Sequence, residues 1–246
     1  MQNLDELITL VESRRYPDIH QATLDAMMTG ETFFFRDTSF FNHIKNDLLP
    51  DIIRQNGDKR SLRIWCAACS TGQEPYSVAM ILDEFASRLR GWDFGIIASD
   101  ISLAAIERAM CGEYNQFEVQ RGLPVNLLLR YFQRNNERWQ VAEHLKSMIT
   151  FEQSSVLNPS SQKTASFDLI LCRNMLIYFS DQTRDRAITT LTRCLAPQGR
   201  LVLGSSEASI VRSPLLSADT GFLSVFKRSA TNGSSGQMAS AGDAAA

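Results

Sequence analysis

The chain has 246 residues, and its 25 basic and 27 acidic side chains leave a formal net charge of −2, which argues against a general nucleic-acid binder. Hydrophobic residues make up 44% of the chain, enough for a substantial core, and no apolar run reaches the about 20 residues that a membrane span requires. The first residues carry no secretion signal and the five cysteines are an odd number. We therefore expect reduced thiols, a cytoplasmic location and no membrane insertion.

The first fifty residues have the apolar spacing of helices. Leu4, Leu7, Ile8 and Val11 recur at helical intervals, which predicts a helix over 4–13. Similar patterns predict helices over 19–28 and 38–49, the second of them ending near Pro50.

From residue 62 onwards, short apolar runs alternate with helical patterns, which is typical of a parallel sheet with crossover helices. The predicted strands cover 62–67, 94–100, 167–172, 200–205 and 222–227, and the helices begin near Pro75, Ser102 and Asp181. Between 113 and 150 the pattern breaks into a helical stretch and short strands, at 138–143 and 149–153, which predicts a small insertion on the sheet. Residues 229–246 hold no Leu, Ile, Val or aromatic residue, so we expect a disordered tail or a linker there.

The segment CAACSTGQEPYS, residues 66–77, joins the first predicted strand to a helix through small side chains. Small residues let the backbone come close to a ligand, and Glu74 stands where a carboxylate could accept from a ligand ammonium. Only Gly72 is present, so the segment is not a glycine-rich nucleotide loop, and a tight structural turn is an equal alternative.

Two further segments place polar residues at the ends of predicted strands. Asp100 ends the second strand, where an acid can hold the hydroxyls of a ribose or, alternatively, cap the next helix. Arg173, Asn174 and Tyr178 follow the strand 167–172 and supply a fork of donors, an amide and a phenol. For Arg173, an internal ion pair is the alternative to a ligand contact.

The segment MTGETFFFRD, residues 28–37, combines three phenylalanines with an arginine. Some of these rings must be buried, which would dock the segment on the sheet and let Arg36 reach a site there. Alternatively, the rings form a hydrophobic clamp and Arg36 lies on the surface.

The pair Cys66 and Cys69 has the spacing of a metal or redox motif. A zinc site needs four ligands, and the remaining cysteines and histidines are scattered along the chain. We therefore expect no metal site.

Taken together, TGETFFFRD, WCAACSTGQEPYS, ASDIS, LLLRYF and CRNMLIYF, in this order, resemble the chemotaxis receptor glutamate O-methyltransferase (CheR) family over residues 4–227. The resemblance implies an α/β fold, the class I S-adenosylmethionine-dependent methyltransferase, with a Rossmann-like, mostly parallel sheet and a small inserted β-subdomain. It assigns 1–28 to a remnant of a truncated N-terminal helical domain and 29–228 to the methyltransferase domain, with the insertion at about 113–150. Residues 229–246 form the tail.

The same resemblance implies the site. The cofactor S-adenosyl-L-methionine, whose product is S-adenosyl-L-homocysteine, would contact Gly30, Thr32, Arg36, Glu74, Asp100, Leu157, Asn158, Arg173 and Asn174. The catalytic residues would be Arg36, Arg173 and Tyr178. Two departures stand out: Gly30 replaces an asparagine of the family motif, and Leu157-Asn158 inverts its Asn-Leu.

The implied reaction is methylation of glutamate side-chain carboxylates in the cytoplasmic helical region of methyl-accepting chemoreceptors. Relatives that bind a receptor pentapeptide carry a longer, glycine-bearing loop at 134–138, so we expect this protein to act without that tether, and as a monomer. Two other functions stay open: a methyltransferase of the same fold with another acceptor, and a cofactor-binding regulatory module with little turnover.

Overall fold

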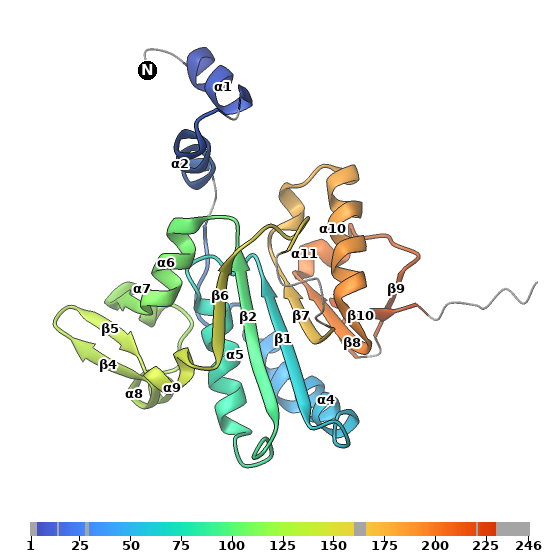
Figure 1. Ribbon diagram of the computed structural model, residues 1–246. Coiled ribbons are helices and arrows are strands. Elements are labelled where there is room, and N and C mark those ends of the chain that lie inside the picture. The colour runs from blue at the N-terminus through green and yellow to red at the C-terminus, as the bar shows by residue number, and fades with distance from the viewer. Residues whose placement is uncertain (1–3, 14, 28–29, 160–165, 220, 230–246) are drawn as a thin grey trace, which may run out of the picture.

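The computed structural model describes residues 4–13, 15–27, 30–159, 166–219 and 221–229. At its centre lies a sheet (Figure 1), which has seven strands. In spatial order its strands are β6 (Ile149–Gln153), β2 (Asp93–Asp100), β1 (Ser61–Ala67), β7 (Phe167–Cys172), β8 (Leu195–Leu203), β10 (Val225–Arg228) and β9 (Leu216–Ala218). Pairing is parallel from β6 to β8, and β10 is antiparallel to both of its neighbours. The predicted α/β class is confirmed. The tail beyond residue 229 lies outside the described residues.

Helices precede the first strand and connect the later ones. They are α1 (Leu4–Ser13), α2 (Pro17–Met27), α3 (Thr38–His43), the π-helical η1 (Ile44–Leu48), α4 (Leu49–Gln55), α5 (Gln73–Glu84), α6 (Leu103–Cys111), η3 (Leu176–Tyr178), α10 (Asp181–Cys194) and α11 (Ser205–Ala208). In the described ranges, none of the helices combines the length and the apolar character that crossing a bilayer demands.

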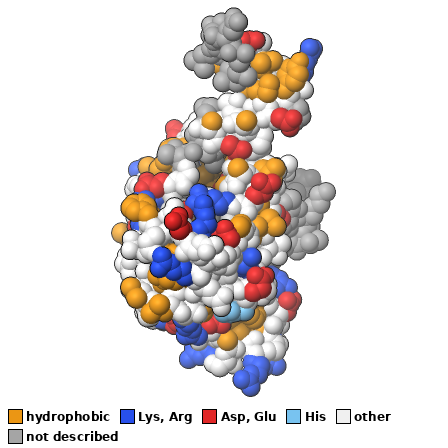
Figure 2. All heavy atoms as spheres, turned by 90° about the vertical axis from the view of Figure 1, so that its left-hand side faces the viewer, with side chains coloured by type: hydrophobic (Ala, Val, Ile, Leu, Met, Phe, Trp, Pro, Cys, Tyr) orange, Lys and Arg blue, Asp and Glu red, His pale blue; other side chains and the backbone are white. Residues whose placement is uncertain are grey.

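A second, antiparallel sheet follows α6 in the chain. It has the order β3 (Glu113–Asn115), β5 (Arg138–Val141), β4 (Phe132–Asn135), with α7 (Gln116–Gln120), α8 (Val125–Tyr131) and α9 (Glu143–Lys146) around it. On this side of the molecule, acidic and basic side chains are intermixed (Figure 2). The run 149–153, which we expected in the insertion, is strand β6 of the main sheet, because Ile149 pairs in parallel register with Ile96.

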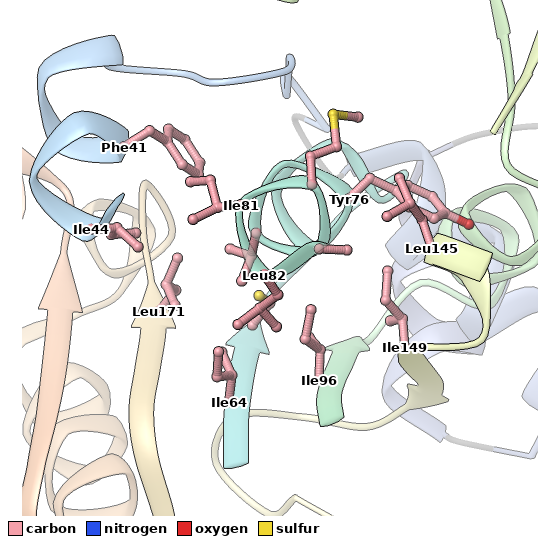
Figure 3. Packing of buried hydrophobic residues seen from close by; sticks show 14 of the residues in the cluster. Phe41, Ile44, Ile64, Tyr76, Ile81, Leu82, Ile96, Leu145, Ile149 and Leu171 are labelled. Carbon is pink, nitrogen blue, oxygen red and sulfur yellow. The ribbon is translucent and has the colours of Figure 1, made fainter. Parts of the chain in front are cut away.

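The two faces of the main sheet bury alternate residues of each strand, as the pleat requires. Ile64 of β1 and Leu171 of β7 point to one face, where they pack against α5 and against Phe41 and Ile44 of the 38–55 helices (Figure 3). Trp65, next in the chain to Ile64, is buried on the opposite face, against which α10 packs. Because both faces are covered, the carboxyl ends of the strands remain as the place for a site.

The helix predicted over 38–49 differs from the structure at its end. It continues beyond Pro50 through η1 and α4 to Gln55. Pro50 lies in the first turn of α4, where the missing N–H costs little, and the preceding π-helical turn accommodates the ring. Proline here therefore marks a change of helix geometry and not a stop.

Candidate functional site

The carboxyl ends of β1, β2 and β7 open onto one cavity of about 690 Å³. From β1 the chain proceeds first to β2 and β6 on one side and then to β7 and β8 on the other, so the cavity lies at the point where the strand order reverses, the usual ligand position in such sheets. Eight of the residues selected from the sequence line it: Gly30, Thr32, Arg36, Glu74, Asp100, Arg173, Asn174 and Tyr178.

Asp100 lies at the end of β2 and is only 3% exposed. Its Oδ2 accepts from the Ser70 N–H at 2.8 Å and its Oδ1 from the Ser102 N–H at 3.0 Å. Burial raises the pKa of Asp100, and these backbone hydrogen bonds oppose the rise. The hydroxyl of Ser102 caps α6 by accepting from the Ala105 N–H at 3.1 Å, so the alternative of Asp100 as the N-cap is wrong.

The loop between β1 and α5 has an unusual backbone. Ala68 and Ser70 have φ values of 58° and 49°, a region that costs non-glycine residues free energy and is enriched at functional sites. Gly72 has φ 95° and is the N-cap of α5, and a Cβ there would lie 2.9 Å from the Ala109 Cβ, so only glycine fits. Since α5 begins at Gln73, Pro75 is its third residue and not its first.

Glu74 lies in the first turn of α5, and its side chain is 14% exposed. Its Oε2 accepts from Nη1 of Arg173 at 3.0 Å. Burial raises the pKa of Glu74, and the neighbouring guanidinium of Arg173 lowers it in part.

Arg173 is enclosed by the protein, with a side chain only 2% exposed. Its Nη1 donates to Glu74, and its Nη2 donates both to the carboxylate of Asp37 and to the Arg36 carbonyl, the latter at 3.1 Å. The guanidinium also lies over the Phe40 ring, 4.3 Å from its centroid. Of the two readings left open by the sequence, the structure therefore shows the internal ion pair.

The turn after Arg173 is fixed by one buried carboxylate. Glu207 is fully buried, and its Oε2 accepts from the N–H groups of Asn174 at 2.8 Å and Gly204 at 2.7 Å. Its Oε1 accepts from Met175 at 2.7 Å and Leu176 at 2.6 Å. These bonds hold Asn174 at φ 59°.

Tyr178 ends the short helix η3. Its side chain lines the cavity, and the residue is 65% exposed. The phenol therefore stands where the cavity meets solvent, in reach of a molecule that approaches from outside.

The segment 30–37 is docked on the sheet domain by its phenylalanines. Phe34 is fully buried and meets Tyr114 edge-on at 4.9 Å, while the Phe35 N–H donates to the Ser77 hydroxyl at 3.0 Å. A Cβ at Gly122 would lie 2.0 Å from the Phe34 carbonyl oxygen, so the backbones touch directly. The expected docking is confirmed.

Arg36 differs from Arg173 in its surroundings. It is half-buried and lines the cavity, and its Nη1 donates to the carbonyl of Glu31 at 2.9 Å. The Phe33 ring contacts both Arg36 and Arg121, and its centroid lies 5.6 Å and 4.4 Å from their respective guanidinium carbons. Among the described residues Arg36 has no salt bridge, and its charge acts at longer range on the carboxylates of Glu31 and Glu74, whose pKa values it lowers in part.

The residues that the segment after β6 adds to the cavity lining differ from those expected from the sequence. Ser154, Ser155 and Val156 line the cavity, whereas Leu157 and Asn158 do not. Leu157 packs partly buried against the α10 side of the core, and Asn158 is exposed. The inverted Leu-Asn pair therefore lies one or two residues past the lining.

Sequence reasoning missed Asp37, Ser70 and Glu207. Asp37 follows Arg36 directly and pairs with Arg173, and Ser70 presents its N–H to Asp100. No motif in the sequence marks Glu207, because its partners are backbone N–H groups. Elsewhere in the described ranges, no three His, Cys, Asp or Glu side chains gather in a way that could hold a metal ion.

Comparison with known proteins shows the family. Residues 30–215 match the family described as CheR methyltransferase, SAM binding domain. The chemotaxis protein methyltransferase Cher2 of Pseudomonas putida and chemotaxis protein methyltransferase 1 of Pseudomonas aeruginosa are each 39% identical over 212 residues, covering 85% of this chain and 76% of each relative. A solved structure, the PH0226 protein from Pyrococcus horikoshii, covers 75% of this chain and 66% of its own at 14% identity and a TM-score of 0.40. The chain belongs to the CheR family of S-adenosylmethionine-dependent methyltransferases.

Proposed function

We propose that this protein transfers the methyl group of S-adenosylmethionine to glutamate carboxylates in the cytoplasmic helical region of methyl-accepting chemoreceptors, forming methyl esters. Family membership and the names of its relatives support the reaction class. One observation carries the assignment to this cavity. The carboxylates of Asp100, which is buried, and Glu74, whose side chain is 14% exposed, line the cavity together with the guanidinium of Arg36 and the exposed phenol of Tyr178.

The cavity fits the cofactor by size and by chemistry. A volume of about 690 Å³ is in the usual range for a small-molecule site. S-adenosylmethionine carries an ammonium, a sulfonium and ribose hydroxyls, all of which suit carboxylate oxygens. Asp100 would accept from the ribose hydroxyls, and Glu74 would face the methionine part. Ala68 and Ser70 also line the cavity, and their small side chains would let the loop backbone come close to the ligand.

The acceptor would meet Arg36 and Tyr178. Arg173 has both of its Nη atoms engaged inside the protein, so it is poorly placed to bind a further carboxylate. We therefore assign Arg173 to positioning, since it ties the segment 30–37 to the start of α5. Arg36 and Tyr178 would orient the acceptor carboxylate.

The chemistry demands little of the protein beyond orientation and the exclusion of water. When bound, the cofactor supplies a methyl group activated by its positively charged sulfur. A glutamate carboxylate is already ionised near neutral pH, since its reference pKa is about 4.3, so no general base is needed. This agrees with the described lining, which includes no histidine. The main contribution of the side chains is therefore alignment of the acceptor oxygen.

The test is transfer of labelled methyl from S-adenosylmethionine to chemoreceptor-containing membranes, measured as methanol released by base. We expect release with wild type and strongly reduced release with Arg36→Ala. Arg90→Ala is the matched control, because Arg90 is exposed and just precedes β2, at the opposite end of the sheet from the cavity. Binding of S-adenosylhomocysteine without any methanol release would reject the acceptor and favour a regulatory module.

We also propose that no receptor pentapeptide is needed. The β4–β5 hairpin has only Asn136 and Glu137 in its turn, with Asn136 at φ 53°. Such a short hairpin supports the absence of the longer peptide-binding loop. Receptors with and without the pentapeptide should then be methylated at equal rates, and a clear preference for the tethered receptor would refute this part of the proposal.

A further inference from the structure

Glu207 is the most completely paired carboxylate around the site, although no sequence motif points to it. It is fully buried, and its two oxygens accept four backbone N–H groups at 2.6–2.8 Å. Three of the four donors are consecutive residues, 174–176, of the turn that follows β7. The fourth donor is Gly204, at the end of β8.

The arrangement needs an ionised carboxylate. Burying a charge is unfavourable unless it is fully hydrogen-bonded, and here N–H donors serve both oxygens. A glutamine in the same place has one oxygen and one NH₂ group. Whichever way its amide turned, two of the four N–H donors would face another donor, so half of the hydrogen bonds would be lost.

Three residues that line the cavity lie in or next to the turn that Glu207 holds. Arg173 precedes it, Asn174 lies in it with φ 59°, and Tyr178 follows within η3. A positive φ at a non-glycine residue persists only where its surroundings fix it. At Asn174 the fixing bond is the one from its own N–H to Glu207.

We propose that Glu207 is a positioning residue for methyl transfer. Its carboxylate fixes the 174–176 turn against the end of β8 and thereby sets where the Tyr178 phenol meets the acceptor. It acts through this turn and does not itself line the cavity. The catalytic part of this inference rests on the proposed function, whereas the structural part does not.

The test variant is Glu207→Gln in the full-length protein, compared with Glu107→Gln, which changes an exposed glutamate on α6. Hydrogen–deuterium exchange at the amides of 174–176 and 204 should become at least about tenfold faster in Glu207→Gln only. At saturating cofactor, kcat for receptor methylation should fall by about tenfold or more, because small misplacements of orienting groups cost large factors. Affinity for S-adenosylhomocysteine should fall by a smaller factor than kcat, since Asp100 and Glu74 lie on other elements.

A second variant disturbs the hydrogen bonds of Glu207 without removing its negative charge. Gly204→Ala would place a Cβ 2.7 Å from Oε2 of Glu207 and 3.1 Å from Nδ2 of Asn174. It should also lower kcat more than it lowers cofactor affinity, although both effects should be smaller than in Glu207→Gln. If Glu207→Gln does not fold, this variant tests whether the turn positions the reaction.

The outcomes separate the two claims. Unchanged exchange at 174–176 would show that Glu207 does not hold the turn. Faster exchange with unchanged kcat would show that the turn does not position the reaction, and either result overturns the inference. If wild type itself released no methanol, the proposed function would fall, while the exchange measurement would still decide whether Glu207 anchors the turn.

Discussion

Replacement of Arg173 by methionine is the sharpest test of how the site is held together. Methionine fills much of the volume of the arginine stem but removes the guanidinium. The change leaves Glu74 as a buried carboxylate without its cation and releases Asp37 and the Arg36 carbonyl. It also removes the stacking of the guanidinium on Phe40.

The contacts of Arg173 determine how much stability this substitution removes. Stranding one partner of a buried ion pair costs about 3–5 kcal/mol, and the lost cation–π contact adds about 1 kcal/mol. The pair with Asp37, whose side chain is 45% exposed, adds little because solvent screens it. One effect has the opposite sign. In the described part of the chain, Nε of Arg173 is buried without a hydrogen-bond partner, so its removal stabilises the folded protein by about 1–3 kcal/mol. The net loss of unfolding free energy is about 3 kcal/mol.

This loss should depend on pH through Glu74. Burial already raises the pKa of Glu74 in the folded protein, and removing Arg173, which lowers that pKa, raises it further. The folded state then binds a proton more readily than the unfolded state, so the variant gains relative stability as pH falls. The deficit is therefore largest above the folded pKa and shrinks as pH approaches the unfolded value near 4.5.

Urea unfolding at neutral pH and at about pH 5.5 measures both effects. The double variant Arg173→Met/Glu74→Gln should be more stable than Arg173→Met alone, because no stranded charge remains. Arg90→Ala should match wild type within about 0.5 kcal/mol. A loss below about 1 kcal/mol for Arg173→Met, or one that does not change with pH, would refute the view that Arg173 neutralises a buried Glu74.

The other residues of the site give separate expectations. Asp100→Asn should weaken S-adenosylhomocysteine binding by about 10- to 100-fold in calorimetry, as expected for loss of charge-assisted hydrogen bonds, and equal affinity would exclude Asp100 as a ribose contact. Because burial raises the pKa values of Asp100 and Glu74, wild-type affinity should decline on acidification from a higher pH than for ordinary carboxyls, and less steeply in Asp100→Asn. Tyr178→Phe should leave the melting temperature unchanged, since the side chain is exposed, but lower kcat by about tenfold, as expected for the loss of one orienting hydrogen bond. Arg36→Lys should raise the KM for receptor more than it changes cofactor affinity, because a lysine loses the fork geometry.

Much of the fold follows from local patterns. Short apolar runs that alternate with helical spacing predicted the parallel sheet. Because β7 is buried on both faces, its run LILC, residues 169–172, is continuously apolar. The carboxyl ends of these strands then predicted which residues would meet. Strand β6 was misplaced because its short run ITFEQ looks like those of the insertion, and only its pairing with β2 separates them.

The parts of the site that could not be predicted depend on contacts with no sequence signature. Glu207 accepts from backbone N–H groups, which nearly every residue possesses. The sequence around residue 174 therefore gives no sign that its partner is Glu207, 33 positions away. Asp37 pairs with Arg173 across 136 positions, after a left-handed backbone turn at its own φ of 66°. Neither long-range pairing nor positive φ at a non-glycine residue is visible in composition or periodicity.

The two arginines show why burial has to be known before a role is assigned. In the sequence, Arg36 and Arg173 each follow an apolar run, and the resemblance to the family implies a catalytic role for both. In the structure, Arg173 has a side chain 2% exposed between two carboxylates. Arg36 is half-buried, and among the described residues its hydrogen bond goes to a neutral carbonyl. A cation already neutralised inside the protein gains little from a further anion, while an unpaired one at a cavity gains more. The division of labour, with Arg173 building the site and Arg36 meeting the acceptor, thus follows from packing.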